Sequence, residues 1–247
     1  MLSGIACYGV DRSANSCNLI RPDIGALRSE AMALEVKICG LKTAGMIETA
    51  VTAGADFIGF VFFARSPRNV SVAEAEHLAG VARGRAAIVA LLVDAEDAVI
   101  DEIAARVRPD LLQLHGSETP ERAAAIRART GLPIMKVLKV ADAGDLLPVA
   151  AFRPHVDRFL FDAKPPRDRQ GALPGGNGIS FDWRLMQDFD AARPAMLSGG
   201  LDASNVGEAI RLTGMRSVDV SSGVERAPGE KDADRIKAFI AAARGAL

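Results

Sequence analysis

One short segment of this chain places a reactive side chain where an apolar run meets a glycine. Cys39 lies in VKICG, residues 36–40. Side chains alternate between the two faces of a strand, so Lys37 and Cys39 would face one way and Val36 and Ile38 the other. A thiol in this position is either chemically active or, like most free cysteines, a small buried hydrophobe. The rest of the sequence decides between these interpretations.

The same alternation of polar and apolar side chains recurs in three later segments. Their polar pairs are Gln113 and His115, Asp162 and Lys164, and Asp219 and Ser221. In a closed barrel one face of each strand packs under helices and the other fills the interior, so polar residues confined to one face need a reason. Polar side chains at the carboxyl ends of barrel strands are typical of active sites. For Lys37 and Gln113, which lie deeper, we prefer a polar network that merely fills the barrel.

Two glycine turns predict a phosphate site. Ser198, Gly199 and Gly200 follow one apolar run in LSGGL, and Ser221, Ser222 and Gly223 follow the next in SSGV. Barrels frequently bind phosphate through bare backbone N–H groups in the loops after their seventh and eighth strands. Either turn alone is only a tight corner, but the two together favour a phosphorylated ligand.

Arg68 and His115 are further candidates for contact with a substrate. Arg68 lies in RSPRN, where its guanidinium either forks onto a substrate carboxylate or stands in solvent. Of the histidines, only His115 falls at a strand end. No set of His, Cys and carboxylate residues has the spacing of a metal site, so we expect no metal and take Cys7 and Cys17 as free thiols.

The elements that must hold these residues alternate regularly along the chain. Strand-like apolar runs are followed by helical patterns, with Thr43 and Ser71 as predicted N-caps and Glu74 completing a capping box. The predicted strands span residues 36–40, 57–63, 86–93, 111–116, 133–140, 158–164, 195–200 and 217–223. The predicted helices span residues 43–54, 97–107, 120–130, 142–152, 181–189 and 203–213, with two more starting at residues 71 and about 232.

Eight strands in near-continuous apolar runs, each followed by a helix, are typical of a parallel sheet covered on both faces. We therefore predict an α/β fold, a single (β/α)8 TIM barrel over residues 35–247, which form the catalytic domain. An open doubly wound sheet is the structural alternative. The GxGxxG turn that such a sheet uses for a dinucleotide is missing after the first strand, which argues against a dinucleotide site.

Residues 1–34 show neither strand alternation nor a sustained helical stripe. We expect them to form a poorly ordered, non-barrel extension. Met32 stands just before the first strand, so one hypothesis is that the working protein starts there, which the intact mass of protein from its native source would test.

Composition narrows the class of partner. The chain has 247 residues, of which 49% are hydrophobic and 25% charged, with a net charge of −1 and only 5% aromatic residues. These values argue against nucleic acid as a partner and favour a small molecule. No apolar run approaches the ~20 residues that span a bilayer, and no signal peptide precedes Cys7, so we expect a cytoplasmic protein with no membrane contact.

Seven motifs in register resemble those of the phosphoribosylanthranilate isomerases of tryptophan biosynthesis, from Val36 to the C-terminus. The motifs are KICGL, GFVFFARSPRNV, LLQLHGSE, FLFDAK, GGNGISFDW, LSGGL and DVSSGVERAPGEKD. The resemblance implies a TIM barrel isomerase without cofactor or metal, and we expect a monomer. Its reaction would be the Amadori rearrangement of N-(5'-phosphoribosyl)anthranilate to 1-(2-carboxyphenylamino)-1-deoxyribulose 5-phosphate.

The resemblance also implies roles for individual residues. Cys39 would be the general base at C2' of the ribose, and Asp162 the general acid at the ring oxygen. Arg68 would hold the anthranilate carboxylate, and Asp219 would face the sugar. The implied substrate-binding set is Arg68, His115, Ser198, Gly199, Gly200, Asp219, Ser221, Ser222 and Gly223. One departure from the family pattern is Asn177, where threonine is more usual.

Two other functions remain open at this stage. The isomerase of histidine biosynthesis performs the same rearrangement, but it is expected to carry an aspartate where this chain has Cys39. A catalytically inactive barrel that only senses a phosphorylated ligand would have no need of Cys39, Asp162 and Arg68 together. A turnover assay separates an enzyme from a sensor.

Overall fold

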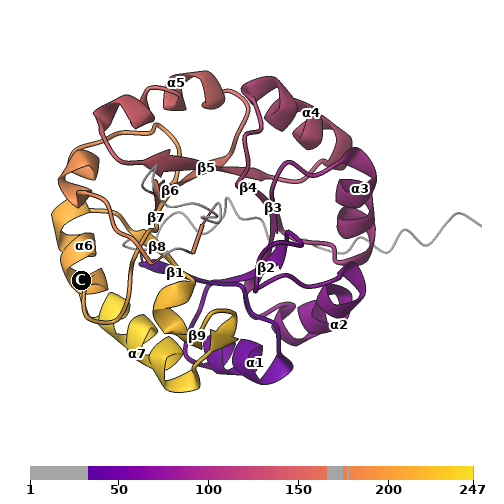
Figure 1. Cartoon of the computed structure of the whole chain (residues 1–247), viewed down its shortest axis with the longest axis horizontal. Coiled ribbons are helices and arrows are strands. Elements are labelled where there is room, and N and C mark those ends of the chain that lie inside the picture. The colour runs from indigo at the N-terminus through magenta and orange to yellow at the C-terminus, as the bar shows by residue number, and fades with distance from the viewer. Residues whose placement is uncertain (1–32, 166–174, 177, 247) are drawn as a thin grey trace, which may run out of the picture. The chain divides into compact units, whose positions relative to one another are not determined.

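Eight parallel strands close into a barrel in the computed structural model, which describes residues 33–165, 175–176 and 178–246 (Figure 1). β1 pairs with both β2 and β8, and this double pairing closes the ring. The strands are β1 (Glu35–Cys39), β2 (Phe57–Phe62), β3 (Ala87–Leu92), β4 (Leu111–Leu114), β5 (Ile134–Val140), β6 (Arg158–Ala163), β7 (Ala195–Leu197) and β8 (Ser217–Val220). The predicted TIM barrel is thereby confirmed, and the open sheet is excluded.

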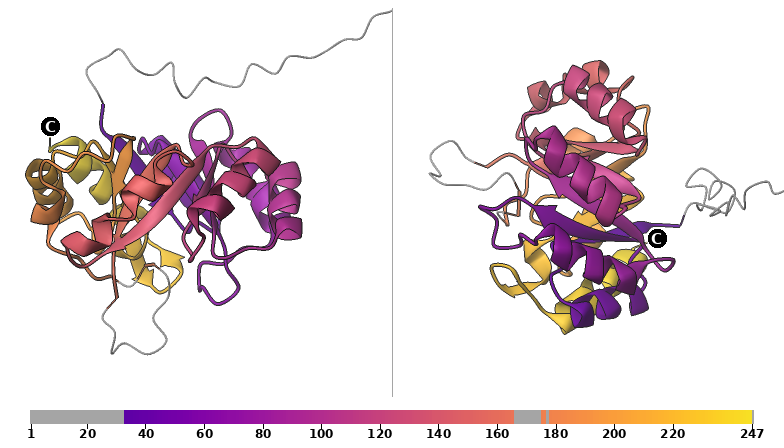
Figure 2. Two further views of the ribbon diagram at one scale, coloured as in Figure 1. Left: turned by 90° about the horizontal axis from the view of Figure 1, so that it is seen from above. Right: turned by 90° about the vertical axis from the view of Figure 1, so that its right-hand side faces the viewer.

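Helices surround the ring and connect successive strands (Figures 1 and 2). The α-helices are α1 (Ala44–Thr52), α2 (Val72–Ala82), α3 (Asp97–Arg106), α4 (Pro120–Thr130), α5 (Val149–Phe152), α6 (Val206–Thr213) and α7 (Ala233–Arg244). The predicted caps are present: Thr43 accepts from the Met46 amide, and Ser71 and Glu74 form a reciprocal capping box. These caps fix where α1 and α2 begin, directly after the loops at the carboxyl end of the barrel.

Two predicted helices differ from expectation. The helix expected over residues 142–152 is a short 3-10 turn η1 (Ala143–Leu146) followed by the single turn of α5. Pro148 stands between them, and its missing N–H and fixed ring prevent a continuous helix. The short helix expected over residues 181–189 contains only the 3-10 turn η2 (Trp183–Met186).

An antiparallel hairpin was not predicted. After the turn η3 (Ser222–Val224), strands β9 (Glu225–Ala227) and β10 (Glu230–Lys231) pair with each other outside the barrel. Gly229 allows the turn between them with a φ of 81°. The hairpin places two charged side chains, Glu225 and Lys231, in buried positions beside the end of β8.

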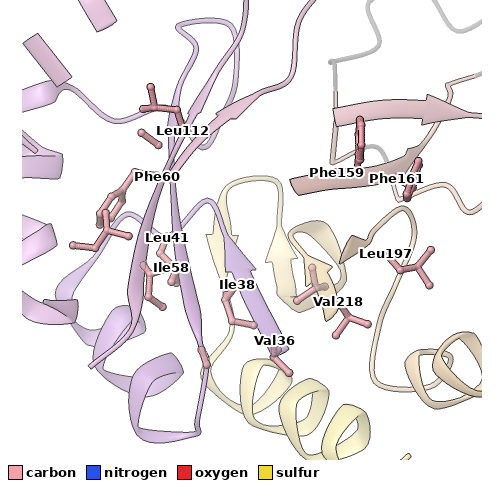
Figure 3. Close-up of a cluster of buried hydrophobic side chains, with 14 of the residues drawn as sticks. Val36, Ile38, Leu41, Ile58, Phe60, Leu112, Phe159, Phe161, Leu197 and Val218 are labelled. Atoms are coloured by element: carbon pink, nitrogen blue, oxygen red, sulfur yellow. The ribbon is translucent and has the colours of Figure 1, made fainter. Parts of the chain in front are cut away.

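The alternation of side chains divides the core into two shells. Apolar residues of one parity, including those labelled in Figure 3, pack between the strands and the helices. The opposite parity fills the barrel, where a layer of Phe57, Val89, Leu111, Met135, Val137, Leu160 and Met196 lies below a smaller cluster of Cys39, Val61 and Leu91. The lower layer supports the polar residues at the mouth, so the site rests on a packed floor.

The extension predicted for residues 1–34 lies outside the described residues up to Met32. Of its last residues, Leu34 is buried in the outer shell of the core, and its carbonyl accepts from Arg244 at the end of α7. Within the described ranges, no helix is both long and apolar enough to cross a membrane.

Candidate active site

A pocket of about 740 Å³, including its open mouth, lies at the carboxyl end of the barrel. Its walls come from the ends of β1, β2, β3, β4, β6, β7 and β8 and from the loops after them. The predicted site residues that line it are Cys39, Arg68, His115, Asp162, Ser198, Gly199, Gly200, Asp219, Ser221 and Ser222. Sequence positions from 39 to 222 are thus brought around one cavity, because parallel strands all end on the same side of the barrel.

Gly223 is the one predicted site residue that does not line the pocket. It packs behind the surface, where a side chain would collide with the Leu201 carbonyl. Because Gly223 has no side chain, η3 can pack close to the loop after β7. The pocket surface at this point comes from Ser221 and Ser222.

Cys39 ends β1 with its side chain inside the barrel and only 3% of its surface exposed. Lys37, two residues earlier on the same face, is fully buried. A Cβ built on Gly59 of β2 would stand 3.1 Å from the Cys39 Sγ and 3.2 Å from the Lys37 Nζ, so both atoms border the same small space. The thiol is therefore next to a buried ammonium group.

Asp219 holds this lysine in place. The Lys37 Nζ donates to the Asp219 Oδ1 at 2.8 Å, and the Ser198 hydroxyl donates to the Oδ2 at 3.1 Å. Both carboxylate oxygens are thus occupied by protein donors, although Asp219 lines the pocket. Lys37, Asp219 and Ser198 link β1, β8 and β7 through one buried network.

Burial and three nearby charges set the ionisation of the thiol. Burial raises the pKa of Cys39, the ammonium groups of Lys37 and Lys231 oppose this, and the Asp219 carboxylate adds to it, so the pKa lies above its ordinary value. Burial works to lower the pKa of Lys37, but Asp219 and Cys39 outweigh it and leave the pKa raised. Lys37 therefore stays charged beside the sulphur.

Asp162 ends β6 with its side chain in the same pocket. Its Oδ1 accepts from the Ala163 amide at 2.9 Å, and its Oδ2 lies 3.3 Å from the His115 Nε2. The His115 Nδ1 lies 3.4 Å from the Gln113 Nε2. Gln113 of β4 and His115 just after it face the same way, as the sequence pattern predicts, and both line the pocket that Asp162 lines.

Arg68 is held by a buried carboxylate that sequence reasoning missed. Its Nε and Nη2 each donate to Glu225 of β9 at 2.8 Å, and the Nη2 also donates to the Gly176 carbonyl at 3.3 Å. Lys231 of β10 donates to the same carboxylate at 2.7 Å and to the Ser221 carbonyl at 2.8 Å. One edge of the guanidinium is therefore taken by the protein, and among the described residues no hydrogen-bond partner is found for Nη1, which is the side for a ligand.

The β9–β10 hairpin has buried charges and a recognisable sequence pattern. Burial works to raise the pKa of Glu225, but Arg68 and Lys231 outweigh it and leave the pKa lowered. Burial lowers the pKa of Lys231. The segment ERAPGEKD carries alternating charges around a Pro-Gly turn, a pattern that favours a hairpin. Nothing in that segment predicts that Glu225 pairs with Arg68, which lies 157 residues away in the sequence.

The glycine turn after β7 brings bare backbone to the pocket wall. Gly199 has a φ of 88°, and a Cβ there would stand 2.6 Å from the Ala163 amide nitrogen. Only glycine fits this combination of left-handed backbone and close approach. Asn177, the position at which the chain departs from the family pattern, lies outside the described residues.

Comparison with known proteins matches this site to one family. The family model described as N-(5'phosphoribosyl)anthranilate (PRA) isomerase matches residues 36–242, which include every predicted site residue. This chain belongs to the phosphoribosylanthranilate isomerase family. The N-(5'-phosphoribosyl)anthranilate isomerase of Rhizobium meliloti (strain 1021) is 55% identical over 215 residues, which are 87% of this chain and 99% of the relative. That of Mesorhizobium japonicum is 54% identical over 215 residues, or 87% of this chain and 97% of the relative.

Solved structures agree. The phosphoribosyl anthranilate isomerase of Thermotoga maritima superimposes with a TM-score of 0.77 at 35% identity, covering 86% of this chain and 99% of that one. A family member in complex with reduced 1-(o-carboxyphenylamino)-1-deoxyribulose 5-phosphate has a TM-score of 0.74 at 33% identity, with the same coverage. Among the residues that the structure describes here, no three His, Cys, Asp or Glu side chains are grouped to hold a metal ion.

Proposed function

We propose that this chain isomerises N-(5'-phosphoribosyl)anthranilate to 1-(2-carboxyphenylamino)-1-deoxyribulose 5-phosphate in tryptophan biosynthesis, with Cys39 as general base and Asp162 as general acid. The observation that carries the proposal is that these two side chains lie in the same pocket. They end β1 and β6, both point into the barrel, and both line one pocket. Membership of the isomerase family supplies the reaction.

The rearrangement needs an acid and a base on different sides of the sugar. Asp162 gives its proton to the ring oxygen as the C1'–O bond breaks, which leaves an iminium between C1' and the anthranilate nitrogen. Cys39 then takes the proton from C2', and the electrons of that C–H bond form the C1'–C2' double bond of the enolamine. The enolamine becomes the ketone when C1' gains a proton and the C2' hydroxyl loses its proton. In the ring of eight strands β6 lies three strands from β1, so the two groups approach the sugar from separate walls.

The pocket has groups that could bind each end of the substrate, the carboxylate and the phosphate. Arg68 offers the Nη1 edge of its guanidinium to the anthranilate carboxylate. His115 lies next to Asp162, close to the position of the reacting carbons. The backbone around Gly199 and Gly200, with Ser221 and Ser222, offers N–H and hydroxyl groups to the phosphate. A substrate held at both of these points would have its ribose near Cys39 and Asp162, which line the same pocket.

Oligomeric state, location, cofactor need and domain extent are also part of the proposal. The enzyme acts as a monomer, since each residue assigned a role lies on one chain. It works in the cytoplasm. It needs no cofactor, because acid and base groups alone complete the reaction. Residues 35–247 are the catalytic domain, and residues 1–34 are an extension without a catalytic role. Size-exclusion chromatography with light scattering tests the first, and turnover by a variant that starts at Met32 tests the last.

Fluorescence-monitored conversion of phosphoribosylanthranilate by the purified chain tests the function. Substrate fluorescence should fall with time, at a rate proportional to protein concentration. A Cys39→Ala preparation made in the same way controls for contaminating host enzyme. A chain that binds reduced 1-(o-carboxyphenylamino)-1-deoxyribulose 5-phosphate yet shows no turnover above that control would be the sensor, not the isomerase.

A further inference from the structure

The roles proposed so far leave Lys37 unused, although it is among the most deeply buried large side chains in the described part of the chain. A buried lysine is unusual, because removing an ammonium group from water is unfavourable unless it is paired. Lys37 donates to one carboxylate, Asp219, and its ammonium borders the same space beside Gly59 as the Cys39 sulphur. Sequence reasoning assigned Lys37 to a network that merely fills the barrel, which does not explain why the lysine stands beside the thiol.

The geometry makes Lys37 rigid. Its ammonium donates to Asp219 at 2.8 Å, and Asp219 is itself fixed by the Ser198 hydroxyl at 3.1 Å. Lys37 pairs with Phe57 of β2 on one side and with Asp219 of β8 on the other, so its backbone is held within the closed ring. The charge therefore cannot move away from the sulphur by a change of rotamer into solvent.

We propose that Lys37 is a positioning residue that, held by Asp219, keeps its ammonium against the Cys39 sulphur and stabilises the thiolate that serves as the base. The inference rests on the proposed role of Cys39. When Cys39 loses its proton, the new negative charge arises next to an ammonium that already borders the same small space beside Gly59, so little reorganisation is needed. When Cys39 takes the C2' proton it becomes neutral, and Lys37 keeps its pairing with Asp219.

Three charged side chains act on the thiol. Lys37 lies on the same strand as Cys39, Asp219 lies on β8, and Lys231 lies on β10. β2 places Gly59 and Val61 beside Cys39, neither of which titrates. Lys231 differs from Lys37 because it is hydrogen-bonded to Glu225 and Ser221 and acts on the thiol only through its charge. Lys37 is thus the lysine whose ammonium borders the same space beside Gly59 as the sulphur.

Titration of the thiol itself tests the proposal. In full-length protein with Cys7→Ser and Cys17→Ser, Cys39 is the only thiol, and its ionisation can be followed by thiolate absorbance and by the pH dependence of its alkylation by iodoacetamide. Lys37→Met should move the midpoint at least one pH unit upward. The thiolate fraction at neutral pH, and kcat/KM with it, should fall at least tenfold.

A matched control separates this effect from loss of a buried ion pair. Lys136 is also buried and paired with Glu118 at 2.7 Å, but it lies on the outer face of β5, away from the pocket. Lys136→Met should leave the Cys39 midpoint unchanged. Lys37→Gln, which keeps a donor for Asp219 but no charge, should shift the midpoint as Lys37→Met does and serves if the methionine variant does not fold.

The outcomes are distinct. A folded Lys37→Met or Lys37→Gln protein whose thiol titrates at the parent's midpoint overturns the proposal. So does an equal shift in Lys136→Met. The titration needs no substrate, so it stands apart from the proposed function, which fails on its own if the parent does not convert phosphoribosylanthranilate.

Discussion

At the scale of single residues, the ionisation of Cys39 controls the chemistry. Burial raises its pKa, and the nearby lysines do not fully offset this. A base must be deprotonated to act, so kcat/KM should rise with pH through a pKa above that of a free cysteine. A pH profile of kcat/KM checks this. A profile that is flat from neutral to alkaline pH would show that the thiol is not the base.

Removal of either proton-transfer group should affect turnover far more than binding. Cys39→Ala and Asp162→Asn should each lower kcat by ~10²–10⁴-fold, because general acid or base catalysis contributes about that much. Binding of the reduced product analogue, measured by calorimetry, should change little. Near-full turnover by either variant would remove that residue from the mechanism.

Arg68 should act mainly on binding. Arg68→Ala should raise KM with a smaller change in kcat, because the anthranilate carboxylate lies away from the reacting carbons. Glu225→Gln should raise KM in the same direction but less, since it weakens the pair that orients Arg68. Steady-state kinetics measure both effects.

An exposed ion pair provides the control for Glu225. Glu48 and Arg85 also form a two-point pair, but both side chains are about half exposed. Exposed pairs contribute little, so Glu48→Gln should leave KM unchanged. An unchanged KM in Arg68→Ala would place that arginine outside the binding site.

At the scale of elements, the turn after β7 depends on a glycine. Gly199→Ala should raise KM and lower the free energy of unfolding by ~1–3 kcal/mol, because left-handed backbone and contact with the Ala163 amide both oppose a side chain. Gly84 has a similar φ of 77° with open space around it. Gly84→Ala should therefore lower stability less and leave KM unchanged. Urea denaturation and kinetics compare the two.

Strand and helix order could be predicted because each signal is local. Alternation in VKICG and LLQLHG identified inward-facing residues, and Thr43 and Ser71 marked helix starts that the structure confirms. The break at Pro148 in the helix expected over residues 142–152 was also local and was overlooked. The pairs Lys37 with Asp219 and Arg68 with Glu225 join positions 182 and 157 residues apart, and no pattern within one segment encodes such contacts.

At the scale of the whole molecule, ligand binding should stabilise the folded barrel. Residues from seven strand ends line the pocket, so a ligand that contacts them joins distant parts of the chain. Reduced 1-(o-carboxyphenylamino)-1-deoxyribulose 5-phosphate at a hundred times its Kd should add ~2.7 kcal/mol and raise Tm. Inorganic phosphate should give a smaller rise that Gly199→Ala reduces. No rise with the analogue would contradict the assigned pocket.

The ring of strands is completed by hydrogen bonds between residues 35–38 and 217–220. During synthesis on the ribosome β1 emerges early, and its partner β8 emerges only after nearly all of the chain has been made. Until then β1 offers an unpaired backbone edge, which readily joins strands of other chains. The nascent chain is therefore most prone to aggregate just before its last strand arrives, and a chaperone that shields residues 35–39 would raise the yield of native protein.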